Sequence, residues 1–452
     1  MSAPLPQSNG HKTGVFEGVT VYHWLVVLIA SFGWLFDCMD QAIFSLARES
    51  ALKELLPAGG DAVKFGGYAT TSMILGWATG GIIFGMMSDR WGRVKTMVVT
   101  LLVYSGFTGF SGIARNEMEF IAFRFLVGLG VGGMFGAATT LVAESVPSGF
   151  RALALGSLQA LSATGNIMGG LLAANLFQPG AKEVWMGYSG WRLLFFVGVL
   201  PALLVVPMII FLREPEAWKR AKAEAAQSAG AKDKQVGSIG ALFKHPRWRH
   251  HATIGLLLGV SGMIGLWGIG FFSPELVSRA LEGQPQEIVD RVRANGFVLQ
   301  NVGSFLGMLA FTFAASFLSR RLAFLGSFIF CLFSTAFVFK NLNSPTDAYW
   351  MLPMMGFAQL AVFAGYSIYF PELFPTRLRG TGVGFCYNTV RYLAAPAPTL
   401  LGYLSTRMSF RTAAIAMSSV YLIGIIALIW APETKGKPDY TERLAAALRS
   451  RD

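Results

Sequence analysis

Residues 144–156 read ESVPSGFRALALG, and residues 372–384 read ELFPTRLRGTGVG. Each stretch begins with glutamate and then places proline three residues on, arginine seven on and glycine twelve on. Each also lies between two long apolar segments, at the same point of its half of the chain. Because spacing and position agree together, the two stretches indicate an internal duplication, and we expect a fold of two similar halves.

The composition places both halves in a membrane. Of the 452 residues, 53% are hydrophobic and only 14% are charged, and the mean hydropathy is +0.51. A soluble core of this size cannot bury so much apolar surface, which indicates an all-α membrane protein. Windows of about 20 mostly apolar residues predict twelve transmembrane helices. They cover residues 24–46, 66–87, 96–113, 119–141, 152–176, 192–212, 252–274, 297–318, 322–340, 348–370, 380–404 and 411–430.

One long polar segment separates the first six windows from the last six. We therefore expect an N-terminal six-helix bundle over residues 1–212, a cytoplasmic linker over 213–250 and a C-terminal six-helix bundle over 251–452. The dipeptides Pro215-Glu216 and Pro432-Glu433 close the two halves and repeat the duplication. Parallel repeats of this kind are typical of secondary transporters, whose substrate site lies near the bilayer midplane between the repeats.

The distribution of lysine and arginine predicts the orientation. With both termini inside, about 23 basic residues fall in cytoplasmic segments and about 10 outside, as the positive-inside rule requires. The same asymmetry accounts for the formal net charge of +12, so we expect no nucleic-acid partner. Residues 1–20 lack the features of a cleaved signal peptide. We expect a monomer in the inner or plasma membrane, with both termini cytoplasmic.

The loop between the second and third windows carries GMMSDRWGRVK at residues 85–95. Glycine permits a tight turn there, and an acid with two bases at a helix end can pair with one another and with a neighbouring helix terminus. The G-x-x-x-D-R-x-G-R pattern resembles the signature loop of the major facilitator superfamily. The resemblance covers essentially the whole chain and implies the major facilitator fold. The gating residues that it indicates are Gly85, Asp89, Arg90, Gly92 and Arg93.

The two repeated stretches supply the remaining gating candidates. They are Glu144, Arg151, Glu372 and Arg379. We expect these side chains to join the 85–95 loop in a latch that forms and releases as the halves move. In the second half the corresponding loop, FTFAASFLSRRLAF at residues 311–324, keeps only Arg320 and Arg321. A mirrored latch there is expected to be degenerate.

Two aspartates lie inside the first apolar window, in GWLFDCMDQAIFSLA at residues 33–47. A carboxylate in the hydrocarbon region is costly, so Asp37 and Asp40 are expected to face the bundle interior or a watery cavity. Their spacing of three places them on one helix face. Because two close carboxylates resist double ionisation, the pair suits a group that takes and releases a proton. The alternative is a structural pair, with each acid bonded to a fixed partner.

The fourth window opens with RFLVGLGVGGMFGAA at residues 124–138. Arg124 and the glycines after it resemble the superfamily's span 4 motif, in which the arginine is linked to proton coupling and the glycines allow close packing. The resemblance therefore adds Arg124 to the proton-coupling candidates. As an alternative, its side chain could reach the outer interface and have no role in transport.

A cation lies near the middle of the eleventh window. Arg391 has Tyr387 and Asn388 one turn before it on the same side. An arginine at that depth needs an anion, either one of the two aspartates or a substrate carboxylate, which its planar fork can hold through two hydrogen bonds. Two prolines just beyond predict a bend. Amides and aromatic rings that could also line the site are Gln159, Asn166, Gln300, Asn301, Trp267 and Tyr366.

Two branches of the superfamily are indicated. The segment FDCMD at residues 36–40, taken with the arginines above, resembles the aromatic acid:proton symporters and their niacin-carrier-like relatives, although the usual motif is D-G-x-D. This resemblance predicts symport of a small organic anion, an aromatic or other monocarboxylate, with protons. The loops PELFPTRLRGTG and PETKGKP resemble sugar porters instead, but the seventh window lacks an amide cluster for hydroxyl groups. A transporter-like sensor would share the same bundle.

Other function classes find no support in the sequence. All five histidines lie at or outside window ends, and the three cysteines lie in apolar segments. We therefore expect neither an enzyme nor a metal or other cofactor. No P-loop is present, which argues against transport driven by ATP. The expected partners are a small-molecule substrate, protons and the lipid bilayer.

Overall fold

The computed structural model describes residues 15–57, 62–175, 186–227 and 236–435, and these ranges form helices without strands. The two chain ends, predicted to be cytoplasmic, lie outside the described residues. The first half contains α1 (Val21–Leu55), α2 (Ala62–Trp91), α3 (Arg93–Gly112), α4 (Glu117–Ser145), α5 (Ser148–Asn175), α6 (Gly190–Val197), the 3₁₀ turn η1 (Leu200–Leu204) and α7 (Val205–Phe211).

Two short helices, α8 (Glu216–Gln227) and α9 (Ile239–Lys244), precede the second half. That half contains α10 (Pro246–Gly268), η3 (Gly270–Phe272), α11 (Ser273–Ala280), α12 (Gln286–Phe317), α13 (Arg320–Asn341), α14 (Pro345–Leu373), η4 (Thr376–Leu378), α15 (Arg379–Ala394), α16 (Ala397–Leu404), α17 (Phe410–Met417), η5 (Ser418–Val420) and α18 (Tyr421–Ala427).

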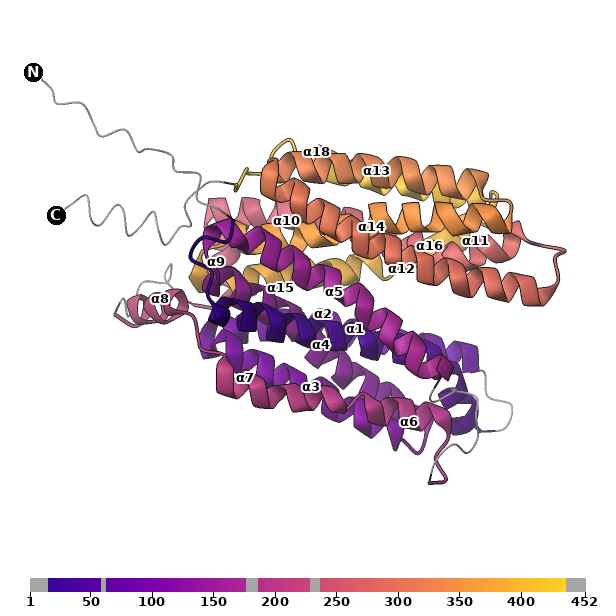
Figure 1. Cartoon of the computed structure of the whole chain (residues 1–452), viewed down its shortest axis with the longest axis horizontal. Helices are drawn as coiled ribbons and strands as arrows, with labels where there is room; N and C mark the ends of the chain where they lie inside the picture. The colour runs from indigo at the N-terminus through magenta and orange to yellow at the C-terminus, as the bar shows by residue number, and fades with distance from the viewer. Residues whose placement is uncertain (1–14, 58–61, 176–185, 228–235, 436–452) are drawn as a thin grey trace, which may run out of the picture.

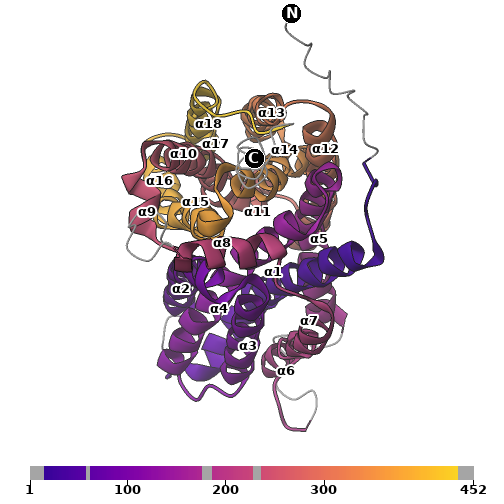
Figure 2. The same cartoon turned by 90° about the vertical axis from the view of Figure 1, so that its left-hand side faces the viewer.

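The long helices form two bundles that lie side by side, one from each half (Figure 1). Helices α8 and α9 lie at one end of the molecule, and Figure 2, which looks onto that end, shows α8 between the two bundles. We call this the α8 end and the opposite one the far end. The linker predicted over residues 213–250 thus contains two helices and the first residues of α10.

Ten helical segments of the described ranges are long and apolar enough to cross a membrane. Helix α5 and the pair α15–α16 run the same length of the bundles, which brings the passes to twelve (Figure 1). Helices can cross a bilayer because their backbone groups are hydrogen-bonded internally. The pair α15–α16 is interrupted around Pro396, since α15 ends at Ala394 and α16 begins at Ala397. The predicted bend is therefore confirmed.

Glycines bring corresponding helices of the two bundles into close contact. A Cβ atom at Gly132 of α4 would collide with the carbonyl group of Trp77 in α2. In the second half a Cβ at Gly356 of α14 would collide with the carbonyl group of Gln300 in α12. Only glycine allows two helix backbones to approach this closely. The packing role expected for the glycines of the fourth window is confirmed, and the crossing fixes Trp77 inside the bundle.

Candidate functional site

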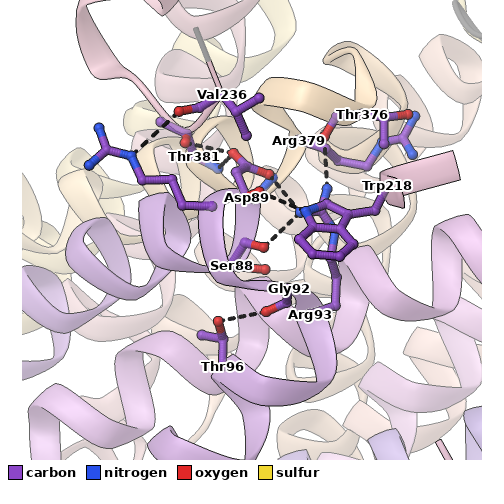
Figure 3. A network of polar contacts seen from close by, with 12 residues as sticks. Ser88, Asp89, Gly92, Arg93, Thr96, Trp218, Val236, Thr376, Arg379 and Thr381 are labelled. Carbon is purple, nitrogen blue, oxygen red and sulfur yellow. Dashed lines mark hydrogen bonds and ion pairs between the residues drawn. The ribbon is translucent and has the colours of Figure 1, made fainter. Parts of the chain in front are cut away.

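A buried carboxylate of the first bundle caps a helix of the second (Figure 3). The Oδ1 atom of Asp89, near the end of α2, accepts a hydrogen bond of 3.0 Å from the backbone N–H of Gly380. Its Oδ2 atom accepts bonds of 2.8 and 2.7 Å from the backbone N–H and the hydroxyl of Thr381. These residues form the first turn of α15. An anion is favoured there because the helix N-terminus presents free N–H groups and a partial positive charge.

Arg93 lies behind this cap and is fully buried. Its guanidinium lies 3.1 Å from Asp89 and 2.9 Å from Glu144. It also donates 2.7 Å hydrogen bonds to the backbone oxygens of Ser88 and, in the second bundle, Thr376. Five donors in a rigid fork allow one arginine to bind two acids and two carbonyls at once. Arg93 therefore links the end of α2 to α4 within the first bundle and to the second bundle.

Glu144 completes the connection. It accepts hydrogen bonds of 2.9 and 3.0 Å from Arg93 and another of 2.9 Å from Nη1 of Arg379 at the start of α15. The structure thus brings together four of the predicted gating residues. We call Asp89, Arg93, Glu144 and Arg379 the interbundle latch. It lies at the α8 end, where α2 and α4 meet α15.

Two glycines allow the latch to form. Gly92 has a φ of +121°, which side chains rarely permit, and a Cβ there would also collide with the carboxylate of Glu214. A Cβ at Gly85 would lie 2.7 Å from the carbonyl oxygen of Gly380, where α2 and α15 cross. The tight turn and the close helix approach expected from the motif are both confirmed.

Two latch neighbours escaped the sequence analysis because only tertiary structure brings them near. The Glu214 carboxylate accepts hydrogen bonds of 2.7 and 3.2 Å from the backbone N–H groups of Arg93 and Lys95, and so caps α3. The indole N–H of Trp218 in α8 donates a 2.7 Å bond to the backbone oxygen of Asp89 (Figure 3). The polar linker therefore contributes directly to the latch.

Not every predicted gating residue lies in the latch. Arg90 is exposed and donates a hydrogen bond of 3.4 Å to the backbone oxygen of Val236. Only Arg93 of the two loop arginines pairs with Asp89 in the described structure. Arg151 is partly buried in the first turn of α5.

The second bundle repeats only the arginine–glutamate part of the latch, so the counterpart that was expected to be degenerate keeps one ion pair. Arg320 lies 2.9 Å from Glu372, as Arg93 does from Glu144. The Glu433 carboxylate accepts bonds of 3.0 and 3.2 Å from the backbone N–H groups of Arg320 and Arg321. We call Arg320, Glu372 and Glu433 the mirrored cluster. Its acids come from α14 and from the segment after α18, so the loop sequence alone did not reveal them.

The mirrored cluster also corrects one detail of the repeat. Glu433 was matched with Glu216 from the two Pro-Glu dipeptides, but Glu216 is exposed and pairs with Lys219 at 2.7 Å. Glu214 is the spatial counterpart of Glu433, because both cap the helix that begins at the arginine of their cluster. The position four residues before Arg320, which corresponds to Asp89, is Ser316. Its hydroxyl bonds within α12 to Thr312, so this position supplies no acid that crosses to the other bundle.

Asp40 has a fixed cationic partner deep in the first bundle. Its Oδ2 atom lies 3.6 Å from Nη1 of Arg124, and its Oδ1 atom accepts a 2.8 Å hydrogen bond from Thr108. Arg124 also donates a 3.1 Å bond to the Ser111 hydroxyl. Its guanidinium lies among three phenylalanine rings, 4.7 Å from that of Phe195. Because Arg124 is fully buried, the alternative that it reaches the outer interface is wrong.

Asp37 has no such partner. It is 1% exposed, and neither carboxylate oxygen has a hydrogen-bond partner in the part of the chain that the structure describes. The buried hydroxyl of Tyr104 lies close to both aspartates and is a donor within reach of the Asp37 carboxylate, so what Asp37 lacks is a cation. A carboxylate without a cation is costly to bury in ionised form. The two acids predicted as one pair therefore occupy different environments.

Arg391 meets aromatic rings instead of an acid. Its guanidinium carbon lies 3.4 Å from the centre of the Trp77 ring and 5.3 Å from that of Tyr387. Its Nε atom has no hydrogen-bond partner among the described residues, and no carboxylate of those residues lies within ion-pair distance. Of the two kinds of anion considered for Arg391, the aspartate alternative is therefore wrong for this structure. Arg124, about two turns inside α4, is the arginine that pairs with Asp40.

The two rings that contact this arginine belong to a cluster of aromatic rings from both bundles. Tyr387 of α15 stacks on Phe135 of α4 with ring centres 3.9 Å apart, and Trp34 of α1 lies 4.9 Å from Phe135. Trp34 and Trp77 lie 6.4 Å apart. Sequence analysis did not assign Trp77 or Phe135 to the site, because no spacing distinguishes a ring that faces a site from one that faces lipid. We call Arg391, Tyr387, Trp34, Trp77 and Phe135 the central site.

Several buried polar atoms near these rings lack a partner within the described ranges. They are the indole nitrogens of Trp34 and Trp77, the amide oxygens of Gln159 and Asn388, and Nε of Arg391. Buried polar groups are normally hydrogen-bonded, so these atoms can serve the polar groups of a ligand. Both donors and acceptors are present, and the arginine and tryptophan donors suit a carboxylate.

The other predicted substrate residues are engaged elsewhere. Ser273 donates a 2.7 Å bond to Gln300, and Asn301 donates a 2.9 Å bond to the Phe297 carbonyl. The Tyr366 hydroxyl donates a 2.6 Å bond to the Leu258 carbonyl. These polar groups are thus used within the second bundle. The remaining two, Asn166 of α5 and Trp267 of α10, are partly buried.

Known proteins resemble this chain along most of its length. The cis,cis-muconate transport protein of Acinetobacter baylyi is 28% identical over 420 residues, which cover 92% of this chain and 96% of that protein. The niacin transporter of the same organism is 24% identical over 444 residues, covering 92% and 95%. The solved structure of a proton:xylose symporter matches with a TM-score of 0.74 at 18% identity and covers 94% of this chain and 99% of that one.

The structural match shows the fold, and the sequence matches the family described as Major Facilitator Superfamily over residues 30–398. The expected fold of twelve helices in two six-helix bundles is confirmed, as is the expectation of a transporter instead of an enzyme. This multi-pass membrane protein belongs to the major facilitator superfamily of transporters.

Proposed function

We propose that the protein is a proton-coupled symporter of a small organic anion, whose carboxylate binds Arg391 at the central site. The observation that carries the proposal is the state of Arg391, which is 4% exposed yet has no acidic partner in the described structure. A buried guanidinium requires an anion, and its planar fork matches a carboxylate. The rings of Trp34, Phe135 and Tyr387 beside it suit a flat, conjugated body.

The names of the relatives support the substrate class. Muconate and niacin are both carboxylic acids with a planar conjugated skeleton, and the chain is similar to the transporters of both over more than nine tenths of its length. The xylose symporter shares the fold at only 18% identity and therefore does not bear on the substrate.

The proton is assigned to Asp37, with Asp40 and Arg124 in a supporting role. Asp40 already has an arginine and a threonine hydroxyl as partners, whereas Asp37 has neither. A buried carboxyl without an ion-pair partner is the acid whose ionisation depends most on what the neighbouring site holds. Asp37 is therefore the acid whose protonation can follow the transport cycle.

We assign the latch the role of a gate in transport by alternating access. Its contacts between Asp89 and α15 and between Glu144 and Arg379 join the bundles at the α8 end, so they must break when that end opens. We propose that this end is cytoplasmic in an inner or plasma membrane, with the boundaries 1–212, 213–250 and 251–452 for bundle, linker and bundle. We also propose that the protein works as a monomer.

The experiment that tests the proposal compares acids with their neutral analogues. Purified protein in liposomes is offered nicotinate, benzoate and cis,cis-muconate, the corresponding methyl esters, and xylose, under an imposed pH gradient. An acid should accumulate and its ester should not. Arg391→Ala should weaken binding of the acid by about 2–5 kcal/mol. Arg391→Lys should weaken it less, because lysine keeps the charge and loses only the two-point geometry. Equal losses for acid and ester in correctly folded Arg391→Ala would refute the carboxylate site, and accumulation of xylose alone would indicate a sugar porter.

A further inference from the structure

The buried charged side chains of the described ranges fall into two groups. Asp89, Arg93, Arg320 and Arg379 belong to the latch and the mirrored cluster at the α8 end. The second group, which we call the deep group, belongs to α1, α4 and α15 and consists of Asp37, Asp40, Arg124 and Arg391. This second group carries two negative and two positive charges when all four are ionised.

Half of the deep group is already neutralised. Asp40 and Arg124 form one ion pair, and the hydroxyls of Thr108 and Ser111 bond to its two members. Because both partners belong to the first bundle, the pair can move as one unit when the bundles rock. The charges that remain without an ion-pair partner in the described structure are those of Asp37 and Arg391.

These two residues lie near the same interhelical contact: Asp37 follows Trp34 by one turn on α1, Arg391 follows Tyr387 by one turn on α15, and the rings of Trp34 and Tyr387 lie 6.4 Å apart across the interface between the bundles. Asp37 belongs to α1 and Arg391 to α15, and the Cys38 thiol lies within electrostatic reach of both. The titratable groups beside Asp37 are Asp40 and Cys38 on α1 and Tyr104 on α3, while Arg124 on α4 pairs with Asp40 and Arg391 on α15 lies near Cys38. Of these, Arg391 is the cation that no acid already neutralises.

The free energy of burying charge then depends on what the central site holds. With the site empty, an ionised Asp37 balances Arg391. With a monovalent carboxylate on Arg391 and a proton on Asp37, the region is again neutral. A carboxylate without the proton leaves one net negative charge, and a proton without the carboxylate leaves one net positive charge. A buried net charge typically costs several kcal/mol, so the two singly loaded forms are strongly disfavoured whenever both ends are closed.

We infer that the central site takes a carboxylate with a single negative charge together with one proton on Asp37, and that each transport cycle moves no net charge. The inference rests on the proposed function and specifies its stoichiometry and substrate charge. Coupling arises because only the empty and the doubly loaded carrier can close at both ends. The proton enters from water on one side, neutralises Asp37 while the carboxylate occupies Arg391, and leaves on the other side as Asp37 ionises again.

The first test separates the pH gradient from the membrane potential. Liposomes with the full-length protein receive nicotinate, benzoate or cis,cis-muconate, with potassium and valinomycin to set the potential independently of pH. One proton per monovalent anion predicts about tenfold accumulation per pH unit. It also predicts no change when a potential is applied, whereas one net charge would change accumulation about tenfold per about 59 mV.

Each result of this test decides a different statement. A monocarboxylate whose uptake is faster than in protein-free liposomes, follows the pH gradient and ignores the potential supports the inference. Uptake that follows both gradients overturns it and leaves proton-coupled anion transport standing. Accumulation of divalent muconate alone overturns the substrate charge. Failure of all three acids to accumulate under either gradient removes the proposed function itself.

The second test uses Asp37→Asn, which fixes the neutral state of this side chain. The empty variant then carries the uncompensated charge of Arg391 and cannot return, while the form with bound anion is neutral. We expect net uptake to fall at least tenfold, while exchange of labelled for unlabelled anion across the membrane continues at more than half of the native rate. Retained exchange also shows that the variant is folded. Loss of exchange together with uptake, in protein whose elution and thermal unfolding match the native chain, would overturn charge balance as the basis of coupling.

A control variant should keep both activities. Cys38→Ser changes a side chain beside Asp37 without changing a charge. Net uptake and exchange should both stay within about twofold of native values. If Cys38→Ser reproduces the Asp37→Asn pattern, the pattern reflects packing of α1 and the inference fails.

Discussion

The guanidinium of Arg391 lies against the indole ring of Trp77, with 3.4 Å between the guanidinium carbon and the ring centre. The two residues belong to different bundles, and Gly132 holds Trp77 in place because it lets α4 pack directly on the Trp77 backbone. A cation on the face of tryptophan is attracted by the ring's quadrupole. Trp77 therefore positions Arg391 while leaving its nitrogens available to a carboxylate.

Trp77→Leu should weaken binding of the transported carboxylate by roughly 3- to 30-fold, which corresponds to about 0.5–2 kcal/mol for a cation–π contact. Trp77→Phe should lose less, since a ring face remains. Equilibrium binding of labelled acid to purified protein measures the effect. Trp350→Leu, at an exposed ring near the start of α14, is the matched control. Equal affinities for Trp77→Leu and the control would contradict the positioning role.

Asp89→Asn should open the latch without unfolding the protein. The amide keeps the shape of the side chain, but its bonds to the first turn of α15 lose the negative charge that strengthens them. Spin labels at Lys95→Cys and Leu322→Cys, on exposed positions of the two bundles at the α8 end, should show a roughly tenfold rise in the population of long distances. Transport should slow more than substrate binding weakens.

Glu433→Gln is the matched control for the latch, because Glu433 caps α13 within its own bundle. The distance distribution between the two labels should stay native in this variant. If Asp89→Asn leaves the distribution unchanged as well, the interbundle bonds do not hold the α8 end closed.

Gly92→Ala should destabilise the protein by about 1–3 kcal/mol, since alanine at a φ of +121° is strained and its Cβ meets the Glu214 carboxylate. The measurement is thermal unfolding in detergent. Gly106→Ala in α3 is the control, because a Cβ there has no other atom within 4 Å. Its stability should be unchanged or slightly higher. Similar losses in both variants would mean that the turn at Gly92 tolerates a side chain.

The mirrored cluster should make stability depend on pH. Burial alone would raise the pKa of Glu433, but backbone N–H groups of Lys435, Arg321 and Arg320 bond to the carboxylate and hold its pKa below the usual value. A pKa lowered by folding gives stability that is fully present above the unfolded-state pKa, about 4.3 for glutamate, and is lost as pH falls through the folded-state pKa.

Glu433→Gln should therefore lower the thermal unfolding temperature at pH 7, and the difference from native should shrink below about pH 4. The exposed Glu282→Gln should show no such pH-dependent difference. A difference between native and Glu433→Gln that stays constant from pH 7 to pH 3.5 would mean that the ionised carboxylate contributes nothing.

The latch was predictable because sequence spacing encodes it. Asp89, Gly92 and Arg93 lie within about one turn of chain, and the two repeated stretches place Glu144 at the end of α4 and Arg379 at the start of α15. The fold followed from the same patterns, since twelve apolar windows and a duplication leave few arrangements. What spacing did not reveal is that Asp89 caps α15, because that contact joins residues about 290 positions apart.

The central site was less predictable because it depends on how helices are rotated and how deep their residues lie. The sequence offered two acids and two arginines. Only the packed structure shows that Asp40 pairs with Arg124 and that Asp37 and Arg391 form no ion pair among the described residues. Trp77 and Phe135 look like any other aromatic residues of an apolar window. Glu214 and Glu433 reach their clusters from segments outside the predicted loops.

Helix α15 is continuous from Thr381, in its capped first turn, to Arg391, ten residues later. The two residues therefore move together. The two points are about 15 Å apart along the axis, at 1.5 Å per residue, and the break near Pro396 lies beyond both. A tilt of about 10° about Arg391 would move the capped end by roughly 2–3 Å, enough to separate hydrogen bonds that tolerate only a few tenths of an ångström. A substrate that tilts α15 thus changes the hydrogen bonds to Asp89 directly, without changes in intermediate residues. Substrate binding at Arg391 and closure of the α8 end by Asp89 both depend on the orientation of α15. A variant that strengthens one of them must therefore alter the other.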